Sequence, residues 1–319
     1  MIKTRVQPAT EANTVPNAVD VLRTGGLVAI PTETVYGLAA DATDGEAVAR
    51  IYEVKGRPSF NPLIVHCANA EMARTFGIFD DTANKLASAF WPGPLTLVLP
   101  HKDGSLVSPL VRAGLASVAL RVPIGVSADI IAALGRPLAA PSANLSGRVS
   151  PTRAAHVMDQ LGSAIDMILD AGACQVGLES TIISLAGEEP MLLRSGGVPV
   201  EEIEETLGCA VARSRSDAPV EAPGMMKSHY APRAMVRLNA TEITQEDGAL
   251  NFAASGLSAR HSLNLSPDGD LREAAANLFE YLAAFNRLDV KRIAVAPIPQ
   301  LGLGAAINDR LERAAAPRA

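Results

Sequence analysis

Lys55 and Arg57 are the two residues whose types and spacing most clearly suggest chemistry in this sequence. Lys55 closes a predicted helix, and Gly56 can take the left-handed conformation that ends it. Pro58 then fixes the exit of Arg57, so that two cations flank one sharp bend. This arrangement suits a phosphate clamp, in which lysine acts as a point charge and arginine as a planar fork. In the alternative, Lys55 only complements the helix dipole and Arg57 is solvated. The rigid run into a buried strand ending at His66 favours the clamp.

Small polar side chains follow the predicted strand 138–140, in the run PSANLSG. Open α/β sheets bind ligands beyond the carboxyl ends of their strands, which makes Ser142 and Asn144 candidates for ligand contacts. An ordinary Asx or Ser turn is the alternative. Ser150, followed by Pro151, is either a helix N-cap or part of a helix start that faces an anion.

Two arginines stand inside apolar strand patterns, Arg121 within 117–123 and Arg194 after a leucine pair. A buried guanidinium needs a partner, which is either an internal carboxylate or a substrate carboxylate. The Glu-Ser-Thr run at 179–181 begins another strand and offers hydroxyls to a ligand, with simple edge capping as the alternative.

Two glycine-containing runs are weaker candidates. The run PTETVYGL at 31–38 follows a strand and predicts either a substrate loop or a polar turn. Gly302 and Gly304 precede a helix, but Ile307 replaces the third glycine of a dinucleotide-binding fingerprint, which counts against nucleotide binding there.

Several common kinds of site are missing from the sequence. It contains no GxxxxGK[ST] phosphate loop, no HExxH zinc motif and no GxSxG nucleophile elbow. Cys67, Cys174 and Cys209 lie far apart and outside metal-ligand spacing, so we expect reduced thiols and no protein-held metal.

Length and charge restrict the function further. The chain has 319 residues, is 48% hydrophobic and carries a net charge of -6, which predicts two domains. Residues 1–205 hold 15 Lys and Arg against 22 Asp and Glu, and residues 206–319 hold 13 against 12. A generic nucleic-acid binder needs a basic surplus, so any phosphate must be held by a few focused cations. With no apolar run of membrane-spanning length and no secretory signal, we expect a cytoplasmic protein that binds no membrane.

The elements that must position these residues alternate between strand and helix patterns over the first 205 residues, which predicts an α/β unit with a large mixed sheet. Predicted strands are 27–30, 63–66, 95–99, 118–122, 138–140, 167–169, 181–185 and 191–193. Predicted helices are 15–22, 46–55, 69–76, 81–90, 127–134, 152–161 and 199–207.

A second, smaller unit follows a linker. Residues 208–232 are rich in Pro, Ser and charge and show no period. After them we predict strands at 235–238, 250–253 and 292–296, and a last helix through 308–313. A long helix between these strands is opened by Asp270, with Glu273 three residues on as a capping box. The predicted organisation is a domain over 1–207, a linker over 208–232 and a small α/β domain over 233–319.

Together these segments resemble the YrdC-like threonylcarbamoyl-AMP synthases. PTETVYGL, KGRPSFNPLIVH, LRVP, APSANLSG, ESTI and RSG occur in the family's order, while HYAP at 229–232 and GLGAAINDRL at 302–311 resemble its long, two-domain form. The resemblance implies a YrdC-like open twisted mixed sheet with helices, plus a Rossmann-like C-terminal α/β domain. It implies an enzyme that joins ATP, L-threonine and bicarbonate into threonylcarbamoyl-AMP and pyrophosphate, with Mg²⁺ accompanying ATP.

The resemblance also implies roles for individual residues. Lys55 and Arg57 would be catalytic, and the ATP contacts would be Lys55, Arg57, Asn61, Ser142, Asn144, Ser150, Arg194 and Tyr230, the last closing over the nucleotide from a lid-like linker. The threonine contacts would be Thr34, His66, Arg121, Ala140 and Ser180. A downstream tRNA threonylcarbamoyl transferase machinery would receive the product, with direct tRNA binding by this chain weak or absent.

Two other functions share this domain. A non-catalytic module could hold double-stranded RNA or tRNA, although the acidic first region counts against it. A carbamoyl-adenylate former of the hydrogenase-maturation type carries additional Cys-rich zinc modules, for which three scattered cysteines leave no room.

Overall fold

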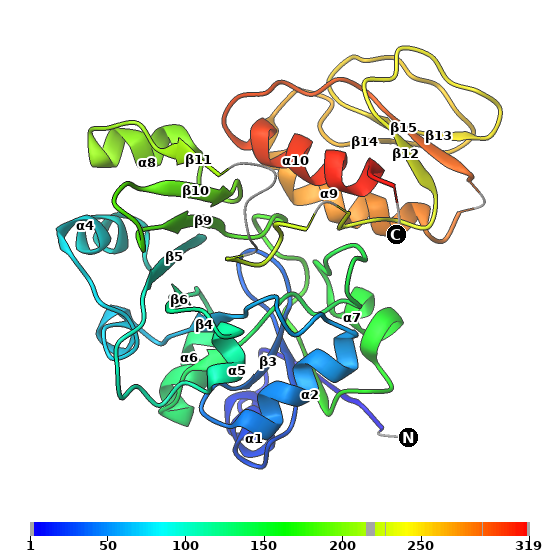
Figure 1. Ribbon diagram of the computed structural model, residues 1–319. Helices are drawn as coiled ribbons and strands as arrows, with labels where there is room; N and C mark the ends of the chain where they lie inside the picture. Colours follow the sequence, from blue (N-terminus) through cyan, green and yellow to red (C-terminus); the bar gives the residue numbers. More distant parts are fainter. Residues whose placement is uncertain (1–2, 215–220, 227, 289, 318–319) are drawn as a thin grey trace.

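The computed structural model describes residues 3–214, 221–226, 228–288 and 290–317. Figure 1 shows a large α/β unit and a smaller one, connected through the segment that precedes β12 (Met235–Arg237). In the described ranges, no helix combines the length and apolar character that crossing a membrane requires.

The large unit is built on one eleven-stranded sheet. Its strands are β1 (Arg5–Pro8), β2 (Val28–Ile30), β3 (Gly37–Asp41), β4 (Ile64–His66), β5 (Leu95–Pro100), β6 (Ser117–Arg121), β7 (Leu138–Ala139), β8 (Met167–Asp170), β9 (Thr181–Ser184), β10 (Met191–Arg194) and β11 (Ala212–Arg213). Their order across the sheet is β1-β8-β2-β3-β7-β4-β6-β5-β9-β10-β11. Parallel pairs such as β4–β6 occur beside antiparallel pairs such as β5–β6, which confirms the predicted mixed sheet.

The helices of this unit are α1 (Thr14–Arg23), α2 (Gly45–Lys55), α3 (Ala70–Ala73), α4 (Asp81–Phe90), α5 (Pro109–Arg112), α6 (Val126–Leu134), α7 (Ala154–Leu161) and α8 (Val200–Leu207). Local sequence signals set the ends of α2. The side chain of Asp44 accepts hydrogen bonds from the first-turn amides of Glu46 and Ala47, and Gly56 ends the helix at φ 58°, in the left-handed region. This termination directs the chain from Lys55 sharply toward β4.

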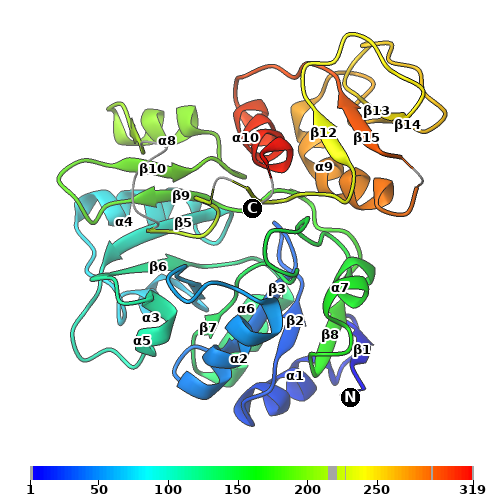
Figure 2. The same ribbon diagram turned by 45° about the vertical axis from the view of Figure 1, so that its right-hand side comes forward.

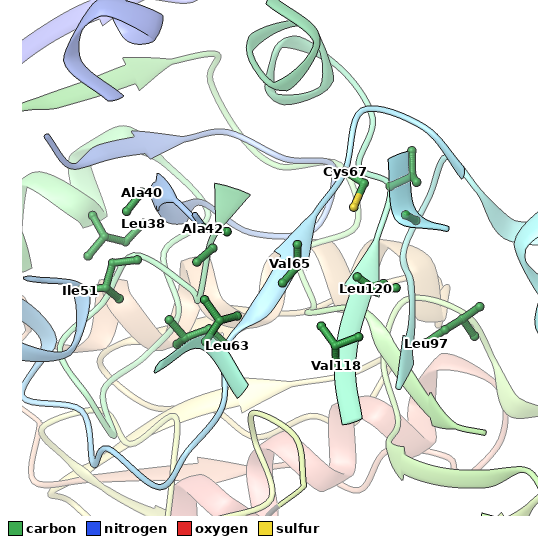
Figure 3. Close-up of a cluster of buried hydrophobic side chains, with 14 of the residues drawn as sticks. Leu38, Ala40, Ala42, Ile51, Leu63, Val65, Cys67, Leu97, Val118 and Leu120 are labelled. Atoms are coloured by element: carbon green, nitrogen blue, oxygen red, sulfur yellow. The ribbon is translucent and has the colours of Figure 1, made fainter. Parts of the chain in front are cut away.

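The two faces of the central strands have different coverings. Side chains of a strand alternate between faces, so Val65 of β4 and Leu120 of β6 project into the main core with Ile51 of α2, as Figure 3 shows. Ile64 and Ala119 project to the opposite face, where they pack against Ala222 from the linker. Helices therefore cover one face of the sheet's centre, and a loop that links the two units covers part of the other.

The small unit is α/β, as the sequence predicted, and its sheet is parallel, with one strand, at 262–264, that the sequence did not predict. Its strands β12 (Met235–Arg237), β13 (Asp247–Asn251), β14 (Ser262–Asn264) and β15 (Arg292–Val295) lie in the order β12-β15-β13-β14. Helices α9 (Leu271–Phe285) and α10 (Leu303–Ala315) pack on each other. In Figure 2, α10 lies between the β9–β10 region of the large sheet and the rest of the small unit. This places one helix of the small unit within reach of the large unit's interior.

The structure corrects several sequence-based expectations. The predicted loop 31–38 passes into strand β3 at Gly37, which small residues had hidden, and the predicted helix 69–76 shrinks to Ala70–Ala73. Asp270 does cap α9, but Glu273 bonds to Ser266 instead of completing a capping box. The final helix starts at 303, five residues earlier than predicted.

Part of the predicted linker cannot be compared with the structure. Residues 215–220 and 227 lie outside the described residues, and the remainder of 208–232 includes the short strand β11.

The backbone of Gly56 lies in the left-handed region of φ and ψ, and a Cβ added there would meet no atom within 4 Å. Replacing Gly56 by alanine should therefore cost backbone strain alone. We expect Gly56→Ala to lower the free energy of unfolding by about 1 kcal/mol, measured by urea titration. Gly187→Ala is the matched control, because Gly187 also has open space but lies outside the left-handed region. Equal stabilities of the two variants would contradict this role of Gly56.

Candidate active site

A small cavity lies over the loop-covered face of the central strands. Its volume is about 40 Å³, close to the space that one water molecule occupies. His66 and Arg121, paired in register at the ends of β4 and β6, form part of its floor. The linker residues Pro223, Gly224, His229 and Tyr230 enclose it from the other side.

Most of the residues that the sequence singled out lie around this cavity. Its lining includes Thr34, Arg57, His66, Arg121, Ala140, Ser142, Ser180, Arg194 and Tyr230. Lys55, Asn61, Asn144 and Ser150 are not part of the lining, and each is buried. Folding therefore brings together segments that lie far apart in the sequence. Nine of the candidate residues line the cavity, and the other four are buried outside its lining.

Lys55 connects the end of α2 to the loop after β7. Its ammonium group donates to the carbonyl oxygen of Ser142 at 2.6 Å and also to that of Asn144. Burial lowers the pKa of Lys55 well below its usual value, and the charge of Arg57 lowers it further. The end of α2 is thus fastened to the loop after β7, which fixes Ser142 at the cavity. The alternative in which Lys55 only complements the helix dipole does not account for these contacts, and Arg57, which that alternative left solvated, is half-buried.

Arg57 is oriented by the loop that follows it. Its Nη2 donates to Asn61 Oδ1 at 2.7 Å and to the Pro62 carbonyl at 2.8 Å, and its Nε donates to the Asn61 carbonyl at 3.1 Å. Burial is the main cause that lowers the pKa of Arg57 to about 10, so the group remains a cation at neutral pH. Asn61 thereby holds the guanidinium, and its own amide faces the linker sulfur of Met226 at 3.6 Å.

Arg121 has an internal carboxylate partner, one of the two alternatives that the sequence left open. Its Nη2 lies 2.6 Å from Glu33 Oε1, and both side chains are buried. Glu33 also accepts from the Ile124 amide at 3.2 Å, while Arg121 Nε donates to the Gly93 carbonyl. The guanidinium still lines the cavity. Glu33 was not singled out, although an acidic residue shortly after a buried strand was a usable signal.

Arg194 is held mainly by backbone oxygens. Its Nε and Nη2 donate to the Ser180 carbonyl at 3.1 and 2.9 Å, and its Nη1 donates to the Pro223 carbonyl of the linker at 3.1 Å. Ser180 Oγ lies 2.7 Å from Thr96 Oγ1 and 3.1 Å from Arg194 Nη2. Burial lowers the pKa of Arg194 from its usual value.

The sequence analysis singled out the run 179–181 for its hydroxyls, but it identified neither the carboxylate of Glu179 nor Arg310 as part of the site. Glu179 Oε1 accepts from Ser150 Oγ at 2.5 Å, and Oε2 lies 2.8 Å from Arg310 Nε of α10. The Arg310 guanidinium also lies 5.0 Å from the ring centre of Tyr230. Because 131 positions separate Glu179 from Arg310, no local spacing announces this pair.

Tyr230 lines the cavity in a constrained conformation. Its φ is 62°, and its hydroxyl is buried without a hydrogen-bond partner among the described residues. The hydroxyl lies beside Gly224, where an added Cβ would be 2.8 Å from it. A polar tip without a partner in a cavity of cations is suited to contact a ligand.

The family of the chain is indicated by two models that together match most of its length. A model described as telomere recombination, covering the Sua5, YciO and YrdC proteins, matches residues 20–196. A model described as the threonylcarbamoyl-AMP synthase C-terminal domain matches residues 198–316.

Individual relatives agree with this match. The threonylcarbamoyl-AMP synthase of Pyrococcus abyssi is 40% identical over 316 residues, covering 93% of this chain and 92% of its own. That of Bacillus subtilis is 40% identical over 325 residues, covering 95% and 93%. The crystal structure of P. abyssi Sua5 complexed with L-threonine has a TM-score of 0.88 at 37% identity, covering 99% of this chain and 97% of that one.

The two buried histidines of the cavity predict how stability depends on pH. Burial, followed by a nearby cation, lowers the pKa of His66 to about 3, and burial likewise lowers that of His229 to about 3. The unfolded chain binds these protons near pH 6.5 and the folded chain does not, so stability falls as the pH drops below 6.5. At pH 5 each histidine should cost about 2 kcal/mol.

Urea titrations between pH 7.5 and pH 5 measure this effect. We expect His66→Gln and His229→Gln each to reduce the loss of stability on acidification relative to the unsubstituted protein. An unchanged pH dependence in the double variant would contradict the neutral burial of both rings.

Proposed function

The chain belongs to the threonylcarbamoyl-AMP synthase family, and from this premise we propose how its cavity forms that product. The protein is an enzyme of the nucleotidyltransferase type that makes threonylcarbamoyl-AMP. In our proposal its substrates are L-threonine, bicarbonate and ATP, and its second product is pyrophosphate. The observation that carries the proposal is the convergence of Arg57, Arg121 and Arg194 on one cavity in an acidic chain.

We place threonine on the floor of the cavity, next to His66 and Arg121. Thr34, Ala140 and Ser180 complete this group, and all five line the cavity. A guanidinium orients a carboxylate, and a hydroxyl of Thr34 or Ser180 can recognise the side-chain hydroxyl of the substrate. A site built to bond that hydroxyl rejects valine, because its own polar groups would then be left without partners. The L-threonine with which the matched P. abyssi structure is complexed supports threonine as a ligand of this chain.

We place the ATP phosphates against Arg57, Arg194 and Ser142. Ser150 and Asn144 lie behind them, and Lys55 and Asn61 hold the loop of Ser142 and the guanidinium of Arg57 in place. A cavity of about 40 Å³ is too small for threonine or for a nucleotide, so the enclosing linker residues Pro223, Gly224, His229 and Tyr230 must move for the substrates to bind. Tyr230 then closes over the bound nucleotide, which makes the linker a lid.

The chemistry requires two bonds to form in sequence. The threonine amine adds to the carbon of bicarbonate and releases water, which leaves a carbamate. A carbamate oxygen then attacks the α-phosphorus of ATP as the bond to the β-phosphate oxygen breaks, so that pyrophosphate leaves with its electron pair. The enzyme contributes by holding two anions together and by stabilising charge on the leaving group with Arg57 and Arg194. No step needs a covalent nucleophile from the protein.

We propose that Mg²⁺ binds as part of the ATP substrate. Among the described residues, no group of three or more His, Cys, Asp or Glu side chains could hold a metal ion. Two carboxylates close to the cavity are already paired, Glu33 with Arg121 and Glu179 with Arg310. Phosphate oxygens and water are ligands that Mg²⁺ accepts readily, so the ion would be held by ATP itself.

We further propose that the product passes to a tRNA threonylcarbamoyl transferase machinery in the cytoplasm. The excess of acidic residues in 1–205 supports weak or absent binding of tRNA by this chain, because a polyanion would be repelled. Cys67 and Cys174 are buried free thiols and Cys209 is an exposed one, as suits a reducing compartment.

Pyrophosphate release, with each substrate omitted in turn, tests the proposed reaction. We expect release to need threonine, bicarbonate and ATP together, and we expect Arg57→Ala to reduce it at least about 100-fold through the loss of a cation at the phosphates. Arg74→Ala, which removes an exposed arginine bonded to Asn84, is the control and should retain full activity. Release without threonine would refute the substrate assignment.

The lid predicts a different effect for Tyr230. Tyr230→Ala removes the ring that packs against Phe279 and Arg310, and we expect the KM for ATP to rise about tenfold or more because closure is lost. Tyr230→Phe keeps the ring and separates packing from hydroxyl contact. Steady-state kinetics of both variants measure this, and an unchanged KM for ATP in Tyr230→Ala would exclude a lid that acts through this ring.

A further inference from the structure

Glu179 is a carboxylate among the cations of the proposed ATP site, and its only described side-chain partner from its own domain is a hydroxyl. It lines the cavity, and Ser150 Oγ donates to it at 2.5 Å. Its charged partner is Arg310, which comes from α10 of the C-terminal unit and is completely buried. A side chain of the small unit therefore neutralises a carboxylate that lines the cavity of the large unit.

Arg310 is held for this purpose by several further contacts. Its Nη1 lies 2.5 Å from Asp309, and its Nη2 donates to the Ser195 carbonyl at 2.8 Å. Asp309 also pairs with Arg313, which donates to the Met226 carbonyl of the linker at 2.7 Å. With Glu179, these side chains form a group of two cations and two anions, so the group as a whole is neutral.

Without Arg310, the cation left to act on Glu179 would be Arg194. Burial opposes the charge of Glu179, but Arg310 and then Arg194 lower its pKa below the usual value, so it is an anion. Arg194 donates its hydrogen bonds to Ser180 and Pro223, and among the described residues it donates to no carboxylate. A free Glu179 would attract Arg194 and would take a cation away from the phosphates.

We infer that Arg310 is a positioning residue for ATP binding: it neutralises Glu179, so that the cavity keeps the positive charge that a triphosphate requires. This inference rests on the proposed function. It also gives the C-terminal domain a defined task at the site, carried out by one side chain.

The two substrates would respond differently to the loss of this cation. ATP carries several negative charges, whereas zwitterionic threonine has no net charge. An uncompensated carboxylate in a buried cavity repels ATP strongly and affects threonine much less, since Coulomb energies scale with ligand charge. A purely structural role of Arg310 would disturb both substrates alike.

A double-mutant cycle with Arg310→Met and Glu179→Gln measures this coupling. The readout is the KM for ATP at saturating threonine and the KM for threonine at saturating ATP. We expect Arg310→Met to raise the KM for ATP about tenfold or more and that for threonine less than about threefold. In the Glu179→Gln background, the same change should alter the KM for ATP less than about threefold, because no charge remains to neutralise.

Two further sets of variants keep the test decisive. Arg310→Lys keeps the positive charge but loses the planar guanidinium, so its KM for ATP should stay within about threefold of that of the unsubstituted protein. This variant tests the inference even where Arg310→Met is too unstable to assay. Arg237→Met and Asp247→Asn change an ion pair within the small unit's own sheet and serve as controls for general destabilisation.

Three results would overturn the inference. They are an equal rise in both KM values in Arg310→Met, an effect of Arg310→Met that persists in the Glu179→Gln background, and a tenfold rise in the KM for ATP in Arg310→Lys. Failure of the proposed function is distinguishable, because the unsubstituted protein would then release no threonine-dependent pyrophosphate.

Discussion

The architecture depends on keeping four basic side chains close together against their mutual repulsion: Lys55, Arg121 and Arg194 are buried and Arg57 is half-buried. Among the described residues, only Arg121 of these four has a carboxylate partner within hydrogen-bond distance, and the other three are satisfied mainly by carbonyl oxygens from loops that flank the strands. Carbonyl dipoles solvate a cation without cancelling its charge, so the cavity remains positive within an acidic chain. A bound ligand with several negative charges would neutralise these cations, which the protein itself leaves largely unpaired with carboxylates.

The need to enclose these cations explains why the two units and the linker all contribute to one site. The face of the sheet that carries Ile64 and His66 is covered by the linker through Ala222 and Tyr230. Helix α10 then reaches behind the linker, where Arg310 contacts both Glu179 and the ring of Tyr230. Tyr230 packs into the apolar cluster of the small unit beside Phe279, while Arg194 of the large unit bonds to Pro223 and Arg313 of the small unit bonds to Met226. The linker that must admit a nucleotide is therefore fastened to both units, and its movement is coupled to them.

Much of this could be predicted from the sequence, because local signals carried it. The Lys55–Gly56–Arg57 bend, the alternation of elements and the Asp270 helix start all depend on neighbouring residues, and the structure contains them. The partners of the buried charges could not be predicted, because Arg121 meets Glu33 across 88 positions and Arg310 meets Glu179 across 131. Strand β3 was missed since Gly37, Ala39 and Ala40 lack the branched side chains that signal a strand, and at Gly37 the close approach of Ala140 favours a small residue.

The central claim is that these cations serve the attack of a threonine carbamate oxygen on the α-phosphorus of ATP. The most direct measurement supplies ¹⁸O-labelled bicarbonate and determines by mass spectrometry the label in AMP recovered after the product decomposes at its carbonyl carbon. Attack by the carbamate predicts one ¹⁸O atom in AMP, and only when threonine is present. Unlabelled AMP formed at the same rate would show that water attacks ATP instead and would contradict the account.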